Sequence, residues 1–108
     1  NKKEYVLSKQ LLKSGTSIGA NINEAIQGQS KKDFLAKMCI SLKEYSETRY
    51  WLDLLRATDY IDDNDAINAN EKCIELEKIL TKIVKTTSKS LKSNFPFSIF
   101  HFQLEYQI

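Results

Sequence analysis

Apolar side chains recur every three or four positions from residue 4 to residue 91, and this spacing constrains the fold more than any other feature of the sequence. Such spacing is typical of one face of an α-helix, whereas a strand would alternate every second residue. The same stretch contains no proline and only three glycines, Gly15, Gly19 and Gly28, so little in it would break a helix. We therefore predict an all-α protein.

Two short polar links divide this stretch into three predicted helices: 4–27, 31–58 and 65–91. Gly28 is expected to end the first helix with a positive φ, and Ser30 is expected to cap the second. The segment 62–65, with the sequence DDND, offers several candidate caps for the third helix and places negative charge at the positive end of its dipole. Links this short make successive helices antiparallel neighbours. The prediction is a helical domain, 1–92, built as an up-down antiparallel bundle of three long helices.

A different pattern follows in the C-terminal tail, residues 93–108. Its apolar residues alternate strictly with polar ones: Phe100, Phe102, Leu104, Tyr106 and Ile108. This is the period of a strand, and one strand is not stable alone. We therefore predict an extended aromatic tail that lies along an apolar groove, pairs with another chain or is disordered.

The segment 14–25, with the sequence SGTSIGANINEA, looks at first like a phosphate-binding loop. A Walker-type loop needs a lysine and a hydroxyl residue directly after its last glycine, but here Gly19 precedes Ala20 and Asn21. The apolar spacing also continues unbroken across both glycines, which indicates a helix. We therefore predict that Gly15 and Gly19 let a neighbouring backbone approach this helix closely.

Four polar residues are predicted to form a structural network that sets the register between helices or subunits: Asn21, Glu24, Glu44 and Glu47. A ligand site is the alternative for Asn21 and Glu24. A di-metal centre would combine glutamates with histidines in Glu-x-x-His motifs, but the one histidine, His101, lies in the tail. No arrangement of nucleophile and base can be built around His101 either. We expect no catalytic residues, no metal and no cofactor, and therefore a protein that is not an enzyme.

The second predicted helix has an additional apolar row that lies well round from its main core stripe. Ile40, Trp51 and Leu54 belong to this row. Apolar groups on a second face indicate that a further helix, another subunit or a partner protein covers them. We predict an oligomer or partner face here.

Lysines give the clearest functional signal. Five of them share one face of the third predicted helix at spacings of four and three: Lys78, Lys82, Lys85, Lys89 and Lys92. If the helices are antiparallel, the end of the third helix lies close to the start of the second helix, which carries three more lysines: Lys31, Lys32 and Lys37. Acidic residues gather instead between 59 and 65. We predict that the basic pole binds the backbone of RNA or DNA. The alternative is an ordinary solvated lysine face, and the lack of interleaved aromatic residues argues against reading of bases or single strands.

Several residues in the first two predicted helices also carry a family resemblance: Ser17, Ile18, Asn21, Ile22, Glu24, Ala25, Phe34, Leu42, Glu44, Glu47 and Leu52. Over roughly 5–61 the chain resembles the four-helix-bundle family encoded in intervening sequences of bacterial large-subunit ribosomal RNA genes. The accessory variability determinant of diversity-generating retroelements is a relative of that family.

The resemblance implies an up-down four-helix bundle that forms a homopentamer, without known catalysis. It also implies that some relatives bind nucleic acid and a reverse transcriptase through basic surfaces. Family members have a further long helix before the position of Tyr5, where only four residues stand here. That helix is expected to be cut away, omitted or replaced by the aromatic tail.

The sequence as a whole predicts a non-enzymatic, oligomeric helical-bundle protein that binds nucleic-acid backbone as an accessory factor. The alternative is a scaffold for protein–protein interaction without nucleic-acid binding. No apolar run approaches the roughly 20 residues that span a bilayer, and the N-terminus lacks the apolar core of a secretory signal. We therefore expect a cytoplasmic protein with no membrane contact.

Overall fold

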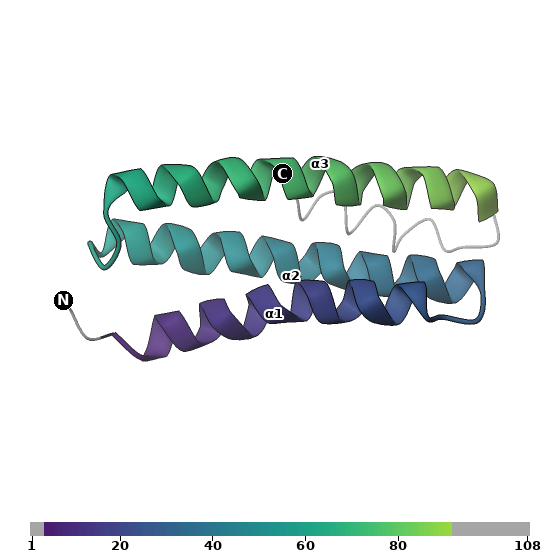
Figure 1. Ribbon diagram of the computed structural model, residues 1–108, viewed down its shortest axis with the longest axis horizontal. Helices are drawn as coiled ribbons and strands as arrows, with labels where there is room; N and C mark the ends of the chain where they lie inside the picture. Colours follow the sequence, from purple (N-terminus) through teal and green to yellow (C-terminus); the bar gives the residue numbers. More distant parts are fainter. Residues whose placement is uncertain (1–3, 92–108) are drawn as a thin grey trace.

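The computed structural model describes residues 4–91 and folds them into three α-helices: α1 (Val6–Ile26), α2 (Lys31–Ala57) and α3 (Asp63–Leu91). Successive helices run antiparallel, and the described residues form no strand (Figure 1). The all-α prediction and all three predicted helices are confirmed. The predicted tail, 93–108, and Lys92 lie outside the described residues.

The starts of the helices follow from local hydrogen bonds. Ser30 has an extended backbone, and its hydroxyl accepts a bond of 3.0 Å from the backbone N–H of Asp33, as the capping prediction requires. Asp62 caps α3 in the same way, because its carboxylate accepts from the backbone N–H of Asp65 at 2.8 Å. Both caps satisfy N–H groups that have no partner inside the helix.

Gly28 does not have the positive φ that was predicted for it. No described glycine has one, and the residue that caps the end of α1 is Gln27, with φ −88° and ψ 0°. A Cβ at Gly28 would lie 2.5 Å from Asp33 Oδ2, the far end of an exposed side chain, and 3.2 Å from the backbone oxygen of Ala25. Among residues 4–91, the residue with a left-handed backbone is Asp59, which follows α2 with φ 63°. The chain thus turns tightly over the start of α2, where a side chain at Gly28 would displace the Asp33 carboxylate.

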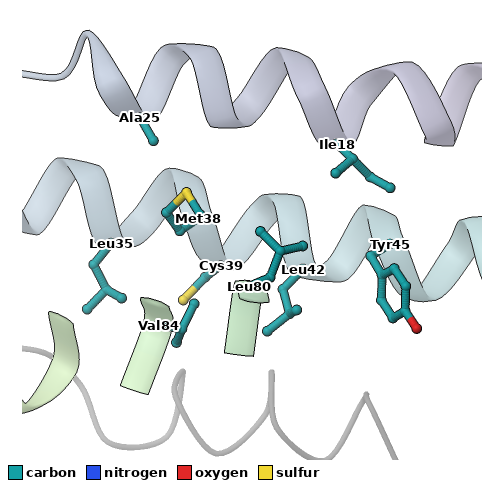
Figure 2. Close-up of a cluster of buried hydrophobic side chains, with 9 residues drawn as sticks. All are labelled: Ile18, Ala25, Leu35, Met38, Cys39, Leu42, Tyr45, Leu80 and Val84. Atoms are coloured by element: carbon teal, nitrogen blue, oxygen red, sulfur yellow. The ribbon is translucent and has the colours of Figure 1, made fainter. Parts of the chain in front are cut away.

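The three helices form a layer in which α2 lies between α1 and α3 (Figure 1). α2 packs along both neighbours, whereas α1 and α3 hardly touch each other. Most side chains of the buried core therefore come from α2: Leu35, Met38, Cys39, Leu42 and Tyr45 (Figure 2). Ile18 and Ala25 meet them from α1, and Leu80 and Val84 from α3. This arrangement leaves one side of α1 and one side of α3 without a helical neighbour among the described residues.

Hydroxyl groups fix the register between α1 and α2. The buried Ser41 hydroxyl donates to the backbone oxygen of Ile18 at 2.9 Å, and Thr48 Oγ1 donates to Ser14 Oγ at 3.0 Å. Both bonds tie α2 to α1.

Within residues 4–91, no helix combines the length and the hydropathy that a membrane span requires.

Candidate nucleic-acid interface

Four of the predicted lysines line the exposed side of α3, and we call them the lysine row: Lys78, Lys82, Lys85 and Lys89. Leu80 and Val84 are buried against α2, and the three- and four-residue spacing of the lysines keeps them out of phase with that buried face. The ion pairs found within residues 4–91 are Lys37–Glu24 and Arg56–Asp63, so none involves the lysine row. Among the described residues, therefore, no carboxylate pairs with these four exposed lysines.

The start of α2 adds positive charge at the end of the lysine row. Lys31 Nζ donates to Ser90 Oγ at 2.7 Å, so the first turn of α2 lies beside the last turn of α3. Lys31 and Lys32 are both exposed. An ammonium has three donors, so Lys31 keeps two for another acceptor. The antiparallel topology thus brings these lysines to one end of the molecule, as predicted.

Lys37 has a different role from the other lysines. Its Nζ lies 2.9 Å from Glu24 Oε1, and this hydrogen bond raises the pKa of Lys37. The pair joins α2 to α1, so the charge of Lys37 is already matched. Glu24 of α1 thus pairs with a cation of the neighbouring helix rather than with the other residues of the predicted polar network.

The other residues of the predicted polar network are not brought together. Asn21 Nδ2 donates to the backbone oxygen of Ser17 at 2.9 Å, within α1 itself. Glu44 and Glu47 are half-buried on α2. Across residues 4–91, no hydrogen bond or ion pair joins Asn21, Glu24, Glu44 and Glu47 to one another. The amide of Asn21 is used locally because a side chain at this position reaches the carbonyl one turn back.

A different polar cluster connects α2 to α3. Arg49 Nη1 donates to the Tyr45 hydroxyl at 3.1 Å, and that hydroxyl donates to Glu77 Oε1 at 3.4 Å. Burial raises the pKa of the Tyr45 phenol, so this group stays protonated at neutral pH. Sequence reasoning missed this cluster. The signal was the Tyr45 hydroxyl, a polar group at a position of the apolar pattern.

Burial keeps the two described thiols, Cys39 and Cys73, in their protonated form. Burial raises the pKa of Cys39 to about 11, which keeps the thiol protonated and a poor nucleophile. Burial also raises the pKa of Cys73. No cluster of three or more His, Cys, Asp or Glu side chains in the described part of the chain is placed to hold a metal ion.

The glycines of α1 meet no other backbone among the described residues, so the predicted close approach is not made to α2 or α3. A Cβ added at Gly15 or Gly19 would find no atom within 4 Å. On the same side of α1, Leu12 is 67% exposed and Ile26 is 70% exposed. A shallow hollow of about 430 Å³ lies here, beside Leu12 and Gly15. The reason is that α3 hardly touches α1, so no described helix covers this side. We call Leu12, Gly15, Gly19 and Ile26 the open face of α1.

The predicted partner face on α2 is partly exposed. Ile40 is 40% exposed, while Trp51 and Leu54 are half-buried. The rings of Trp51 and Tyr50 meet edge to face with centroids 4.9 Å apart, beside a shallow hollow of about 440 Å³. The indole Nε1 of Trp51 is buried and has no hydrogen-bond partner in the part of the chain that the structure describes. This surface presents apolar groups on a side of α2 that its core stripe does not use.

Comparison with known proteins places the chain in a family. Residues 1–82 match the family model described as 23S rRNA-intervening sequence protein. A solved structure from Bacteroides thetaiotaomicron, a protein of unknown function from the S23 ribosomal protein family, is 52% identical to this chain. The match covers 76% of each chain with a TM-score of 0.74. No curated protein matches the chain. From the match over residues 1–82 and the similarity in fold, we conclude that the chain belongs to the 23S rRNA-intervening sequence protein family.

Proposed function

We propose that this protein is a non-enzymatic factor that binds the phosphate backbone of RNA or DNA through the lysine row of α3. The observation that carries the proposal is the exposure of four lysines on one side of α3, with no acidic partner among the described residues. The resemblance to a family in which some relatives bind nucleic acid supports the same function. We infer that the protein acts as an accessory to another factor in the cell, in the cytoplasm.

The lysine row has the dimensions of a phosphate-binding surface. Lys78 and Lys89 are 11 positions apart, which corresponds to about 17 Å along a helix that rises about 1.5 Å per residue. Neighbouring amines therefore lie within a Debye length of about 8 Å to 10 Å, so their potentials add at physiological salt. Lys31 and Lys32 extend this positive region beyond the end of α3.

The proposal is tested by titrating a fluorescently labelled, structured RNA fragment with the protein at low salt and following the anisotropy. Binding should weaken as salt rises, because lysine–phosphate contacts release condensed counterions. The triple variant Lys82→Glu, Lys85→Glu, Lys89→Glu should lose at least about tenfold in affinity. Absence of binding by the parent protein, or equal binding by the triple variant, would contradict the proposal.

We further propose that the protein is a homo-oligomer, specifically the pentamer that the resemblance implies. We also propose that a fourth helix packs on the open face of α1. The exposure of Leu12 and Ile26 supports a covering element. The two glycines support a helix, because they let another backbone approach closely. Each costs about 1 kcal/mol of helix propensity, which close packing would offset.

A scaffold function without nucleic-acid binding is the second candidate, favoured by the apolar surface around Ile40, Trp51 and Leu54. In that case Trp51→Ala would abolish capture of a protein partner, and no salt-sensitive binding to RNA or DNA would be seen. Salt-sensitive binding that Trp51→Ala leaves intact would favour the lysine row instead.

A further inference from the structure

We propose that the lysine row takes the backbone of a double helix in preference to a single strand, an inference that rests on the proposed nucleic-acid binding. α3 would lie along one strand of the duplex, with its lysines on successive phosphates and its buried side still packed on α2. The proposal covers duplex RNA and duplex DNA, which present the same phosphodiester chemistry.

The composition of α3 suits it to contact phosphates rather than bases. α3 contains no aromatic residue, no histidine and no arginine along its whole length. Its second half, from Lys78 to Leu91, also lacks asparagine and glutamine. Bases of single strands are held mainly by stacking on aromatic rings, and base edges are read by arginine, asparagine and glutamine. The lysine row offers only ammonium groups, flanked by the hydroxyls of Thr86 and Ser90, both exposed.

Because α3 and a double helix are both rigid, the lysine row should favour a duplex over a single strand. Hydrogen bonds along α3 and the packing of Leu80 and Val84 on α2 hold the row in place. A duplex presents its phosphates at set positions, so it loses little conformational freedom when it meets such a row. A single strand would have to be ordered, and the row provides no stacking to offset that loss of entropy.

The spacing of charge agrees with one strand of a duplex. Each strand carries one phosphate per about 3.4 Å of helix axis, but the strand also winds about that axis, so its successive phosphates are farther apart than this rise and a straight row about 17 Å long meets fewer than five of them. The row supplies four amines over this length, and Lys31 lies at its end. In the first half of α3, Glu71 and Glu75 are exposed and would repel phosphate. The four amines are therefore enough for the phosphates that the row meets, and the footprint of one α3 should be less than half a turn of duplex.

The test compares a 16-base-pair duplex of mixed sequence with each of its two strands alone, as RNA and as DNA, by anisotropy with the whole protein. The duplex should bind at least about tenfold more tightly than either strand, and a scrambled duplex should bind equally. For each copy of the row that contacts the duplex, Lys85→Gln should reduce the slope of log K against log salt by about 0.9 in magnitude. Lys43 is an exposed lysine of α2, and Lys43→Gln should leave this slope unchanged.

Tighter binding of a single strand than of the duplex would overturn this inference and leave the proposed function standing. A preference of more than about tenfold for one duplex sequence would overturn it as well, because the row has no means of reading bases. If neither duplex nor single strand binds at low salt, the proposed nucleic-acid binding itself fails.

Discussion

α1 and α3 flank α2, and each leaves one side open, but the two open sides carry different chemistry. The open face of α1 consists of glycines and exposed apolar side chains, whereas the exposed side of α3 carries the lysine row. A surface of the first kind is stabilised by contact with another protein segment, and a surface of the second kind attracts a polyanion. Under the proposed function, we expect protein contact on the open face of α1 and nucleic-acid contact on the exposed side of α3.

The two sides depend on α2, and Leu42→Ala would disrupt both at once. Leu42 is fully buried in the core cluster that α1, α2 and α3 share. We expect a loss of about 2 to 5 kcal/mol in the free energy of unfolding, because the substitution removes buried methyl groups and leaves a cavity. Urea denaturation followed by circular dichroism measures it. Lys43→Ala, one residue away and exposed, should change stability by less than about 0.5 kcal/mol. Equal losses from the two variants would mean that Leu42 is not a core residue.

Gly19→Leu tests whether a helix covers the open face of α1. If one packs there, the larger side chain should destabilise the protein by about 1 to 3 kcal/mol through overpacking. Ala20→Leu is the matched control, since Ala20 is exposed on the next position of α1. Thermal melts of the two variants give the comparison. Should Gly19→Leu raise the melting temperature, as its better helix propensity would on a bare face, the fourth-helix proposal would be wrong.

Tyr45→Phe tests the polar cluster on the α3 side. Removing the hydroxyl takes away the bonds to Arg49 and Glu77, and we expect a loss of about 1 kcal/mol. Burial raises the folded-state pKa of this phenol above its ordinary value of 10.0, so folding favours the neutral form. Its contribution is present below pH 10.0 and is lost as pH rises through the raised pKa. The parent protein should therefore lose more stability between about pH 8 and about pH 11 than Tyr45→Phe does. Identical alkaline losses in thermal melts would contradict this role.

Lys37→Gln should have the smallest effect of the four, because its ion pair with Glu24 is largely solvated. The hydrogen bond to Glu24 raises the pKa of Lys37 above 10.5, so the stabilisation is present below that pH and is lost above it. The difference in melting temperature between parent and variant should shrink further in high salt. A loss comparable to that of Leu42→Ala would show that the pair is far more important than its exposure indicates.

Features that depend on neighbouring residues in the chain could be predicted from the sequence. The caps at Ser30 and Asp62 and the three helices follow from such local patterns, as does the exposure of the lysine row, whose spacing differs in phase from that of Leu80 and Val84.

Features that depend on which helix lies next to which could not be predicted. The expectation of packing against Gly15 and Gly19 assumed a neighbour that the described helices do not provide. The pairing of Lys37 with Glu24 likewise follows from the offset between α1 and α2, which periodicity does not specify.

The most direct test of the difference between α1 and α3 is to reverse two lysines on each and compare binding to the same RNA duplex. Lys82→Glu with Lys85→Glu changes α3, and Lys9→Glu with Lys13→Glu changes exposed lysines of α1 by the same total charge. We predict that the α3 variant binds at least about tenfold more weakly than the α1 variant at low salt. Equal dissociation constants for the two variants would contradict the assignment of nucleic-acid contact to α3.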